Sequence, residues 1–215
     1  MRDMLCWTTE KEGQKRMKLL HRSRADHFRA TKEHLVLYLL FFYGASVCGW
    51  LFEVAVYWTQ NYPEFGFLEP LAAYRGVLHG PWAPIYGVGA VLMVLLHRKI
   101  GARPGRFFLS CIGICGVVEY LTAWFLETVF HAKWWDYTGY FLNLHGRICA
   151  ISLLLFAAAG MSVACLAAPR FWTAVEKLPY RGRQMLCLCI TVIFLADLVL
   201  SLASPNLGLG VQICG

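Results

Sequence analysis

Four acidic side chains stand inside stretches of the sequence that are otherwise apolar: Glu53, Glu119, Glu127 and Asp197. An acidic side chain near the centre of a lipid bilayer costs about 2.5 to 3.5 kcal/mol on an insertion scale, so each of these residues needs a compensating partner. Carboxylates retained at such a cost either fix the geometry of packed helices or line a polar cavity that binds or passes a small solute. The four acids are therefore the first candidates for function.

Helical spacing indicates the direction in which these carboxylates point. Two stripes of mostly small residues recur every four positions and carry acids: Ala45, Gly49, Glu53 and Tyr57, and Cys111, Cys115, Glu119, Ala123 and Glu127. Small residues beside an acid allow close helix contact, so we expect the carboxylates to face the protein interior. A third stripe, Gly160, Ala164 and Ala168, carries no acid and is expected to be a packing face.

The elements that position these residues are predicted to be membrane helices. The 215-residue chain has 58% hydrophobic and 15% charged residues, whereas about a quarter of the residues of a soluble domain are charged. The apolar residues form blocks, which predict an all-α protein with five transmembrane helices within 35–202. Their predicted bounds are 35–58, 81–96, 107–130, 148–168 and 185–202. The second is short and starts with two prolines, so it either begins nearer residue 77 or re-enters the membrane.

The basic residues predict the orientation of these helices. Seventeen of the twenty Lys and Arg residues lie in 1–34, 97–106 and 169–184. Because positive charge accumulates on the cytoplasmic side, five crossings predict a cytoplasmic N-terminus and an external C-terminal tail at 203–215. The segment 1–34 either only fixes this orientation or lies on anionic lipid. The net charge of +7 comes from cations that gather in the segments predicted to be cytoplasmic, so we expect no nucleic-acid partner.

Two arginines are the predicted partners of the outer acids. Arg75 and Arg147 are, with Lys133, the Lys and Arg residues predicted on the outer side. We predict that Arg75 and Arg147 neutralise Glu53 and Glu127. The pairs either pin helix ends together or belong to an outward-facing polar cavity.

The segment 131–147, HAKWWDYTGYFLNLHGR, is expected to form a structured outer cap rich in aromatic residues. Asp136 and three histidines, at 79, 131 and 145, fall on the same predicted side, but their spacing matches no standard set of metal ligands. We expect no metal and no cofactor. The nine cysteines include no C-x-x-C pair, and no nucleotide-binding or hydrolase motif is present, so we expect no disulfide framework and no enzyme in this chain.

Four ordered blocks carry a resemblance to a known family: GWLFEV, RGVLHGPWAPIYGVGA, EYLTAWFLETVFHAKWWDY and NLHGRIC. Over residues 38–168 the chain resembles the bacterial family of putative ABC-transporter type IV permeases. The family pattern falls on several of the polar residues above and adds Tyr86 and Asn143. The chain departs from the pattern in the cap, where Phe141, Leu142 and His145 replace the expected residues.

The resemblance implies a membrane subunit of an ABC transporter that moves an unknown small solute across the bacterial cytoplasmic membrane. Such a subunit needs a separate ATP-binding subunit, a second copy of itself, or both, and the segment 169–184 is either a short coupling helix or a basic inner loop. The alternative is a membrane scaffold or regulatory protein whose acid and arginine pairs are structural; an enzyme using Glu119 or Asp197 ranks third. The predicted polar core comprises Glu53, Arg75, Tyr86, Glu119, Glu127, Asp136, Asn143, Arg147 and Asp197.

Overall fold

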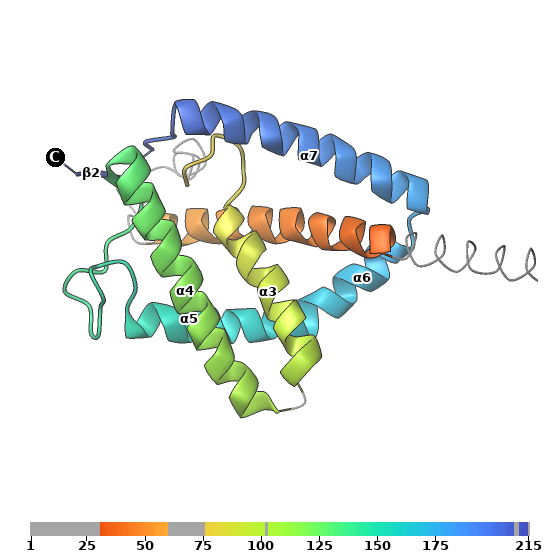
Figure 1. Cartoon of the computed structure of the whole chain (residues 1–215), viewed down its shortest axis with the longest axis horizontal. Coiled ribbons are helices and arrows are strands. Elements are labelled where there is room, and N and C mark those ends of the chain that lie inside the picture. The colour runs from red at the N-terminus through yellow and green to blue at the C-terminus, as the bar shows by residue number, and fades with distance from the viewer. Residues whose placement is uncertain (1–30, 60–75, 102, 209–210, 215) are drawn as a thin grey trace, which may run out of the picture.

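The computed structural model describes residues 31–59, 76–101, 103–208 and 211–214. The described chain is all-helical apart from two strands of two residues each (Figure 1), as the sequence predicts. The helices are Thr31–Thr59, α3 (Pro84–Ile100), α4 (Pro104–Phe130), α5 (Ala150–Ser162), the π-helical turn η1 (Val163–Ala167), α6 (Ala168–Glu176) and α7 (Tyr180–Ala203). The strands β1 (Ala132–Lys133) and β2 (Gln212–Ile213) pair antiparallel. Arg75 lies outside the described residues.

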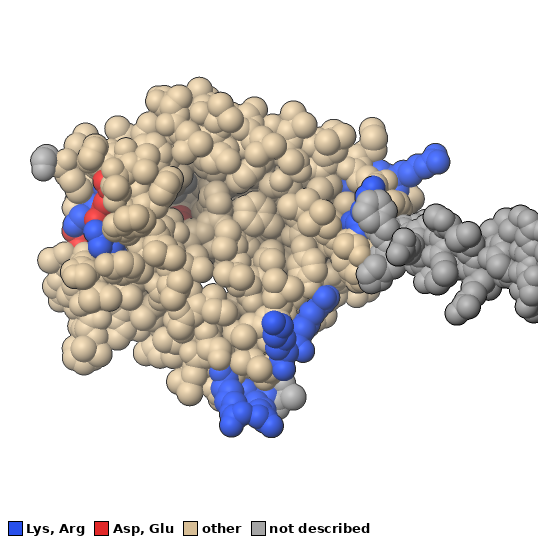
Figure 2. Space-filling model, viewed as in Figure 1, with Lys and Arg blue, Asp and Glu red and all other residues tan. Residues whose placement is uncertain are grey.

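In the described part of the chain, four helices are long and apolar enough to cross a membrane: Thr31–Thr59, Pro104–Phe130, Ala150–Glu176 and Tyr180–Ala203. Large apolar side chains cover their outward faces, including the exposed Leu109, Leu155 and Val199. Figure 2 shows a surface on which Lys, Arg, Asp and Glu occur only in a few places. Such a surface is stable in lipid and not in water. The chain is therefore a membrane protein.

The second predicted span, 81–96, corresponds to α3, which begins at Pro84 and has 17 residues. At about 1.5 Å per residue it is about 26 Å long, less than the roughly 30 Å of a bilayer core. It is not one of the four helices long enough to cross, so a fifth crossing remains a prediction. Pro84 occupies the first turn of the helix, where its missing N–H group breaks no hydrogen bond.

The fourth span does not end at residue 168, as predicted, but continues through Pro169 to Glu176. The reason is the π-helical turn η1, in which the backbone N–H of Ala168 donates to the carbonyl oxygen of Val163, five residues earlier. This wider turn accommodates a proline that has no N–H of its own. The helix bends between α5 and α6 (Figure 1). Of the two alternatives for 169–184, the basic loop is wrong for most of the segment, because α6 runs to Glu176 and α7 begins at Tyr180, before the predicted start at 185.

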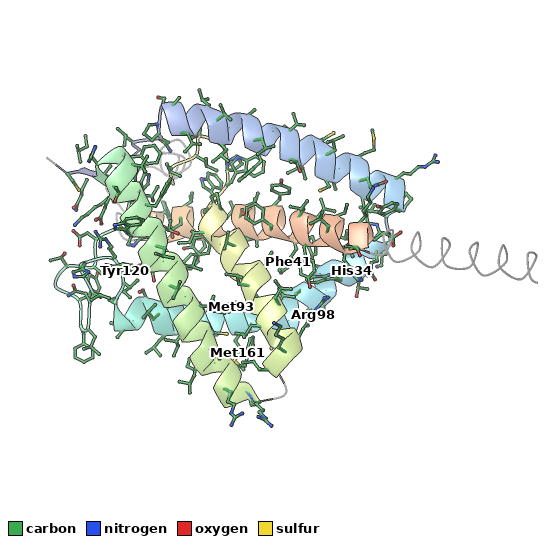
Figure 3. The ribbon with its side chains drawn as sticks, in the orientation of Figure 1. His34, Phe41, Met93, Arg98, Tyr120 and Met161 are labelled. Carbon is green, nitrogen blue, oxygen red and sulfur yellow. The ribbon has the colours of Figure 1, made fainter. Side chains whose placement is uncertain are left out.

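The basic ends of three helices meet on the side of the protein away from the cap. The guanidinium of Arg98 lies over the ring of Tyr38, 5.2 Å from its centroid, and 6.0 Å from that of Trp172. Figure 3 shows Arg98 at the end of α3 near α6, with His34 at the start of the helix Thr31–Thr59. These contacts bring the start of that helix, the end of α3 and α6 together.

The helix Thr31–Thr59 packs tightly on α3 through Gly87. A Cβ atom at this position would lie 2.6 Å from the backbone oxygen of Phe42 and closer still to the hydroxyl of Ser46. The carbonyl of Ser46 also accepts a 3.0 Å hydrogen bond from the N–H of Ala83, just before α3. On the opposite side of α3, Gly160 faces Met93, which confirms the predicted packing stripe on the fourth span. These contacts fix α3 in the core.

We predict that Gly87→Ala destabilises the protein by about 1–3 kcal/mol, because the added methyl group meets backbone that cannot move away. Gly89→Ala is the matched control, since a Cβ there meets nothing within 4 Å, and alanine is the better helix former by about 1 kcal/mol. The free energy of unfolding in mixed micelles measures both. Equal stability of the two variants would contradict the close packing at Gly87.

Candidate functional site

The acid-bearing stripe of α4 faces the interior, as the spacing predicts. Cys111 and Ala123 are buried, and only 4% of Glu119 is exposed. Glu119 stands eleven residues before the end of α4, which is about 16 Å along the helix axis. Its carboxylate is therefore deep within the protein and needs hydrogen-bond donors from the protein itself.

Two hydroxyl groups face the carboxylate of Glu119. The hydroxyl of Tyr137, in the cap, donates to Oε1 at 3.0 Å, and the hydroxyl of Ser152, in the first turn of α5, lies 3.4 Å from Oε2. Ser152 is also 3.0 Å from the carbonyl oxygen of Cys149, and its single proton can serve only one acceptor at a time. Tyr137 is therefore the principal donor to Glu119.

The cap holds Tyr137 as a neutral phenol. Its backbone N–H donates to the carbonyl oxygen of Gly146 at 2.7 Å, and this bond joins the start of the cap loop to its end. Burial raises the pKa of Tyr137, and the negative charges of Glu119 and, more weakly, Glu53 raise it further. The phenol keeps its proton at neutral pH and remains a donor.

Glu53 accepts a short hydrogen bond from the hydroxyl of Tyr86, on α3. The ring of Tyr86 lies directly against Gly49, where any Cβ atom would collide with it, and packs edge-on against Phe156 of α5. Glycine on the acid-bearing stripe thus makes room for the tyrosine that binds the acid one turn later.

We call Glu53, Tyr86, Glu119 and Tyr137 the carboxylate–tyrosine cluster. It draws on the helix Thr31–Thr59, α3, α4 and the cap, and it combines a buried and a half-buried carboxyl group with two phenols. Such a group can bind a solute that carries a positive charge or hydrogen-bond donors, or it can hold a proton between carboxylates. The sequence predicted three of its members as core residues.

The predicted ion pair between Arg147 and Glu127 is present. Nη2 and Nε of Arg147 lie 2.6 and 3.1 Å from Oε2 of Glu127, and both side chains are mostly buried. Nη1 donates to the hydroxyl of Tyr120 at 2.9 Å, and that hydroxyl also bonds Nδ1 of His145. Figure 3 shows Tyr120 on α4 beside the cap. This network anchors the end of the cap to α4.

Two further predicted core residues, Asp136 and Asn143, shape the cap. Asp136 accepts from Lys133 at 3.1 Å and from the backbone N–H of Thr138 at 2.8 Å; the hydrogen bonds from Thr138 and Lys133 lower its pKa. Asn143 accepts from the N–H of Gly146 at 3.2 Å. Gly146 has a φ of +69°, and a Cβ there would lie 2.5 Å from Oδ1 of Asp136. Neither residue bonds a member of the cluster.

Asp197 binds the segment that precedes α3. Its carboxylate accepts the backbone N–H groups of His79 at 3.1 Å and Gly80 at 2.9 Å, together with the hydroxyl of Ser201 at 3.2 Å. These bonds fasten the irregular segment before α3 to α7. The cost of this buried acid is offset by backbone donors of that segment.

The predicted pairing of Arg75 with Glu53 falls outside the described residues. Sequence reasoning did not select Tyr137, Ser152 or Tyr120 as site residues. Tyr120 and Tyr137 belong to the blocks that carry the family resemblance, but no spacing rule connects a residue in a loop to a carboxylate on a helix. Ser152 had no signal, because a serine in the first turn of an apolar helix is ordinary.

We predict that Tyr137→Phe destabilises the protein by about 1–3 kcal/mol, because Glu119 loses its principal donor without gaining water. Tyr140→Phe is the matched control, since Tyr140 is exposed and its ring packs edge-on against that of Tyr137. Unfolding in mixed micelles measures both changes. A loss of stability in the control as large as that in Tyr137→Phe would show that the phenol does not act through Glu119.

In a comparison with protein families, residues 39–202 match the family described as "Putative ABC-transporter type IV". The comparisons with curated proteins and with solved structures gave no match. The matched region covers most of the chain and contains the carboxylate–tyrosine cluster, the cap and α7. The chain therefore belongs to the Putative ABC-transporter type IV family.

Proposed function

We propose that this protein is the membrane permease subunit of an ABC transporter in the bacterial cytoplasmic membrane, with a small polar solute bound at the carboxylate–tyrosine cluster. Membership of the family supports the transporter class. The observation that carries the site is the burial of Glu119 in a membrane-spanning helix, where its principal donor belongs to the cap and not to a helix. Ionisable residues kept inside membrane helices mark solute or ion pathways.

The proposed subunit crosses the membrane five times, with α3 as the additional crossing, the N-terminus in the cytoplasm and the C-terminus outside. The distribution of cations supports this orientation: the junction of α3 with α4 and the junction of α6 with α7 are rich in Lys and Arg. Figure 2 shows blue side chains at these ends and a mixed red and blue group at the far end. The positive-inside tendency assigns the purely basic ends to the cytoplasm.

The chemistry of the cluster favours a solute that offers positive charge or N–H groups. Glu53 and Glu119 are acceptors, and Tyr86 and Tyr137 can turn from donating to carboxylate to contacting the solute with their rings. Movement of the cap would withdraw Tyr137 and open Glu119 to the outer side. The cap then acts as the outer gate of the site.

ATP hydrolysis is assigned to a separate subunit, which would meet the permease on its cytoplasmic side. The helical segment α6 and the basic start of α7 lie at that end. Because α6 is joined to α5 through the bend at η1, movement of a bound partner would shift α5 and with it Ser152. A second copy of the chain would complete the transporter.

A second candidate function is a scaffold or regulatory protein without transport. It is favoured by one observation: within the described residues, Glu119, Glu127 and Asp197 all have partners that join an irregular segment to a helix. Each acid thus has a structural explanation.

One experiment separates the two functions. The tagged chain is purified from its native membranes, and photoreactive ATP is added to the purified material to label any ATP-binding subunit that copurifies. The same material is reconstituted in vesicles and supplied with a metabolite extract. The permease function predicts a labelled partner and ATP-dependent accumulation of a solute, detected by mass spectrometry. Glu119→Gln is expected to keep the partner but to lose most of the accumulation, whereas Glu33→Gln, far from the cluster, is expected to keep both.

Absence of both the partner and the accumulation would contradict the permease function and leave the scaffold. Accumulation that persists in Glu119→Gln would retain transport but exclude the cluster as the solute site.

A further inference from the structure

The tip of the cap carries an exposed apolar surface. Its residues are Tyr140, Phe141, Leu142 and Leu144, and Phe141 and Leu142 are each 72% exposed. Leu142 has a φ of +51°, in the left-handed region. Glycine or asparagine would fit that backbone more easily. A leucine held there, with most of its side chain exposed, indicates that its apolar side chain has a use.

Several polar groups of the tip form hydrogen bonds within the cap and with the residues that follow it. The side chain of Asn143 donates to the carbonyl oxygen of Tyr140 at 3.0 Å and accepts from Gly146. The backbone N–H groups of Tyr140, Asn143 and Leu144 donate to carbonyl oxygens of the cap and of Ile148. No residue from 140 to 144 is charged. These bonds lower the cost of moving the tip into a poorly hydrated medium.

The cap descends beside the helices and does not stand above them. Tyr137 reaches Glu119, which lies about 16 Å below the end of α4 at 1.5 Å per residue, and His145 bonds Tyr120. The carbonyl oxygen of Phe141 accepts the N–H of Ala150 at 3.3 Å, so the tip lies beside the first turn of α5. Figure 1 shows the loop that follows β1 next to the start of that helix.

The apolar surface of the fourth span continues directly into the tip. Ile151, Leu154 and Leu155 are exposed from the first turn of α5 onward, on a helix long enough to cross the membrane. Phe141 extends this lipid-facing surface at its upper edge. Aromatic and apolar side chains at such a level bury themselves at the boundary between headgroups and acyl chains.

We propose that the tip of the cap, at Tyr140, Phe141, Leu142 and Leu144, inserts into the adjoining lipid leaflet and anchors the cap to the bilayer. The occupant of this surface is phospholipid, because the tip is continuous with a lipid-facing helix and lies at its depth. The anchor holds the tip of the cap in lipid, while Tyr137 holds the part of the cap before the tip on Glu119. This inference rests on the membrane insertion of the helices and is independent of transport.

The test places the photoreactive residue p-benzoylphenylalanine at position 141 or 142 of the full chain in phospholipid nanodiscs. Both side chains project outward, so the label need not disturb the fold; the thermal midpoint of each variant checks this. Position 212, an exposed glutamine on β2, is the control. After irradiation, mass spectrometry identifies the adducts.

The expected result is a phospholipid adduct at 141 and 142, several-fold more abundant than at 212. Adducts to a second copy of the chain would overturn the proposal in favour of a protein interface. Lipid adducts no more abundant than at 212 would overturn it in favour of a tip exposed to water. If the thermal midpoint of a labelled variant falls, Leu142→Trp in nanodiscs that contain brominated lipid replaces it. Quenching of the fluorescence that the new tryptophan adds supports the anchor, and absence of quenching contradicts it.

Discussion

A carboxylate buried among membrane helices has to receive its hydrogen bonds from the protein, because neither lipid nor bulk water can supply them. Glu119 meets this requirement mainly through Tyr137, a residue of the cap. The cap must therefore fold down beside α4 and stay there. The ion pair of Arg147 with Glu127 holds its second end, and the pairing of β1 with β2 holds its first. Much of the irregular structure thus follows from one buried acid.

The same principle explains the other acids on the helices. Glu127 binds an arginine that follows the cap loop, and Asp197 binds backbone N–H groups of the segment before α3. For these two acids a helix supplies the negative group and a non-helical segment supplies donors, whereas Glu53 accepts from Tyr86 on α3. An apolar bilayer gives such segments no hydrophobic reason to pack on helices, so buried polar bonds fix their position. Function then depends on which of these bonds can open.

The sequence predicted the structural features that follow from the spacing of residue types along a helix and from the distribution of charged residues. Four-residue spacing identified the buried face of α4, and the scarcity of outer cations identified Arg147 as the partner of Glu127. It did not predict the passage of the helix through Pro169, because a π-helical turn has no simple sequence signature. It did not predict the partners of Asp197, because backbone donors from a distant segment carry no side-chain signal. Tyr137 escaped selection for the same reason: a loop places it through tertiary contacts.

The central claim is that Glu119 and Tyr137 act as a pair that joins the cap to the helices. A double-mutant cycle with Glu119→Gln and Tyr137→Phe, measured by reversible unfolding in mixed micelles, tests it most directly. We predict a coupling free energy of about 1 kcal/mol or more, the typical value of a buried hydrogen bond. Additive effects, with a coupling below about 0.5 kcal/mol, are the behaviour of independent sites and would contradict the claim.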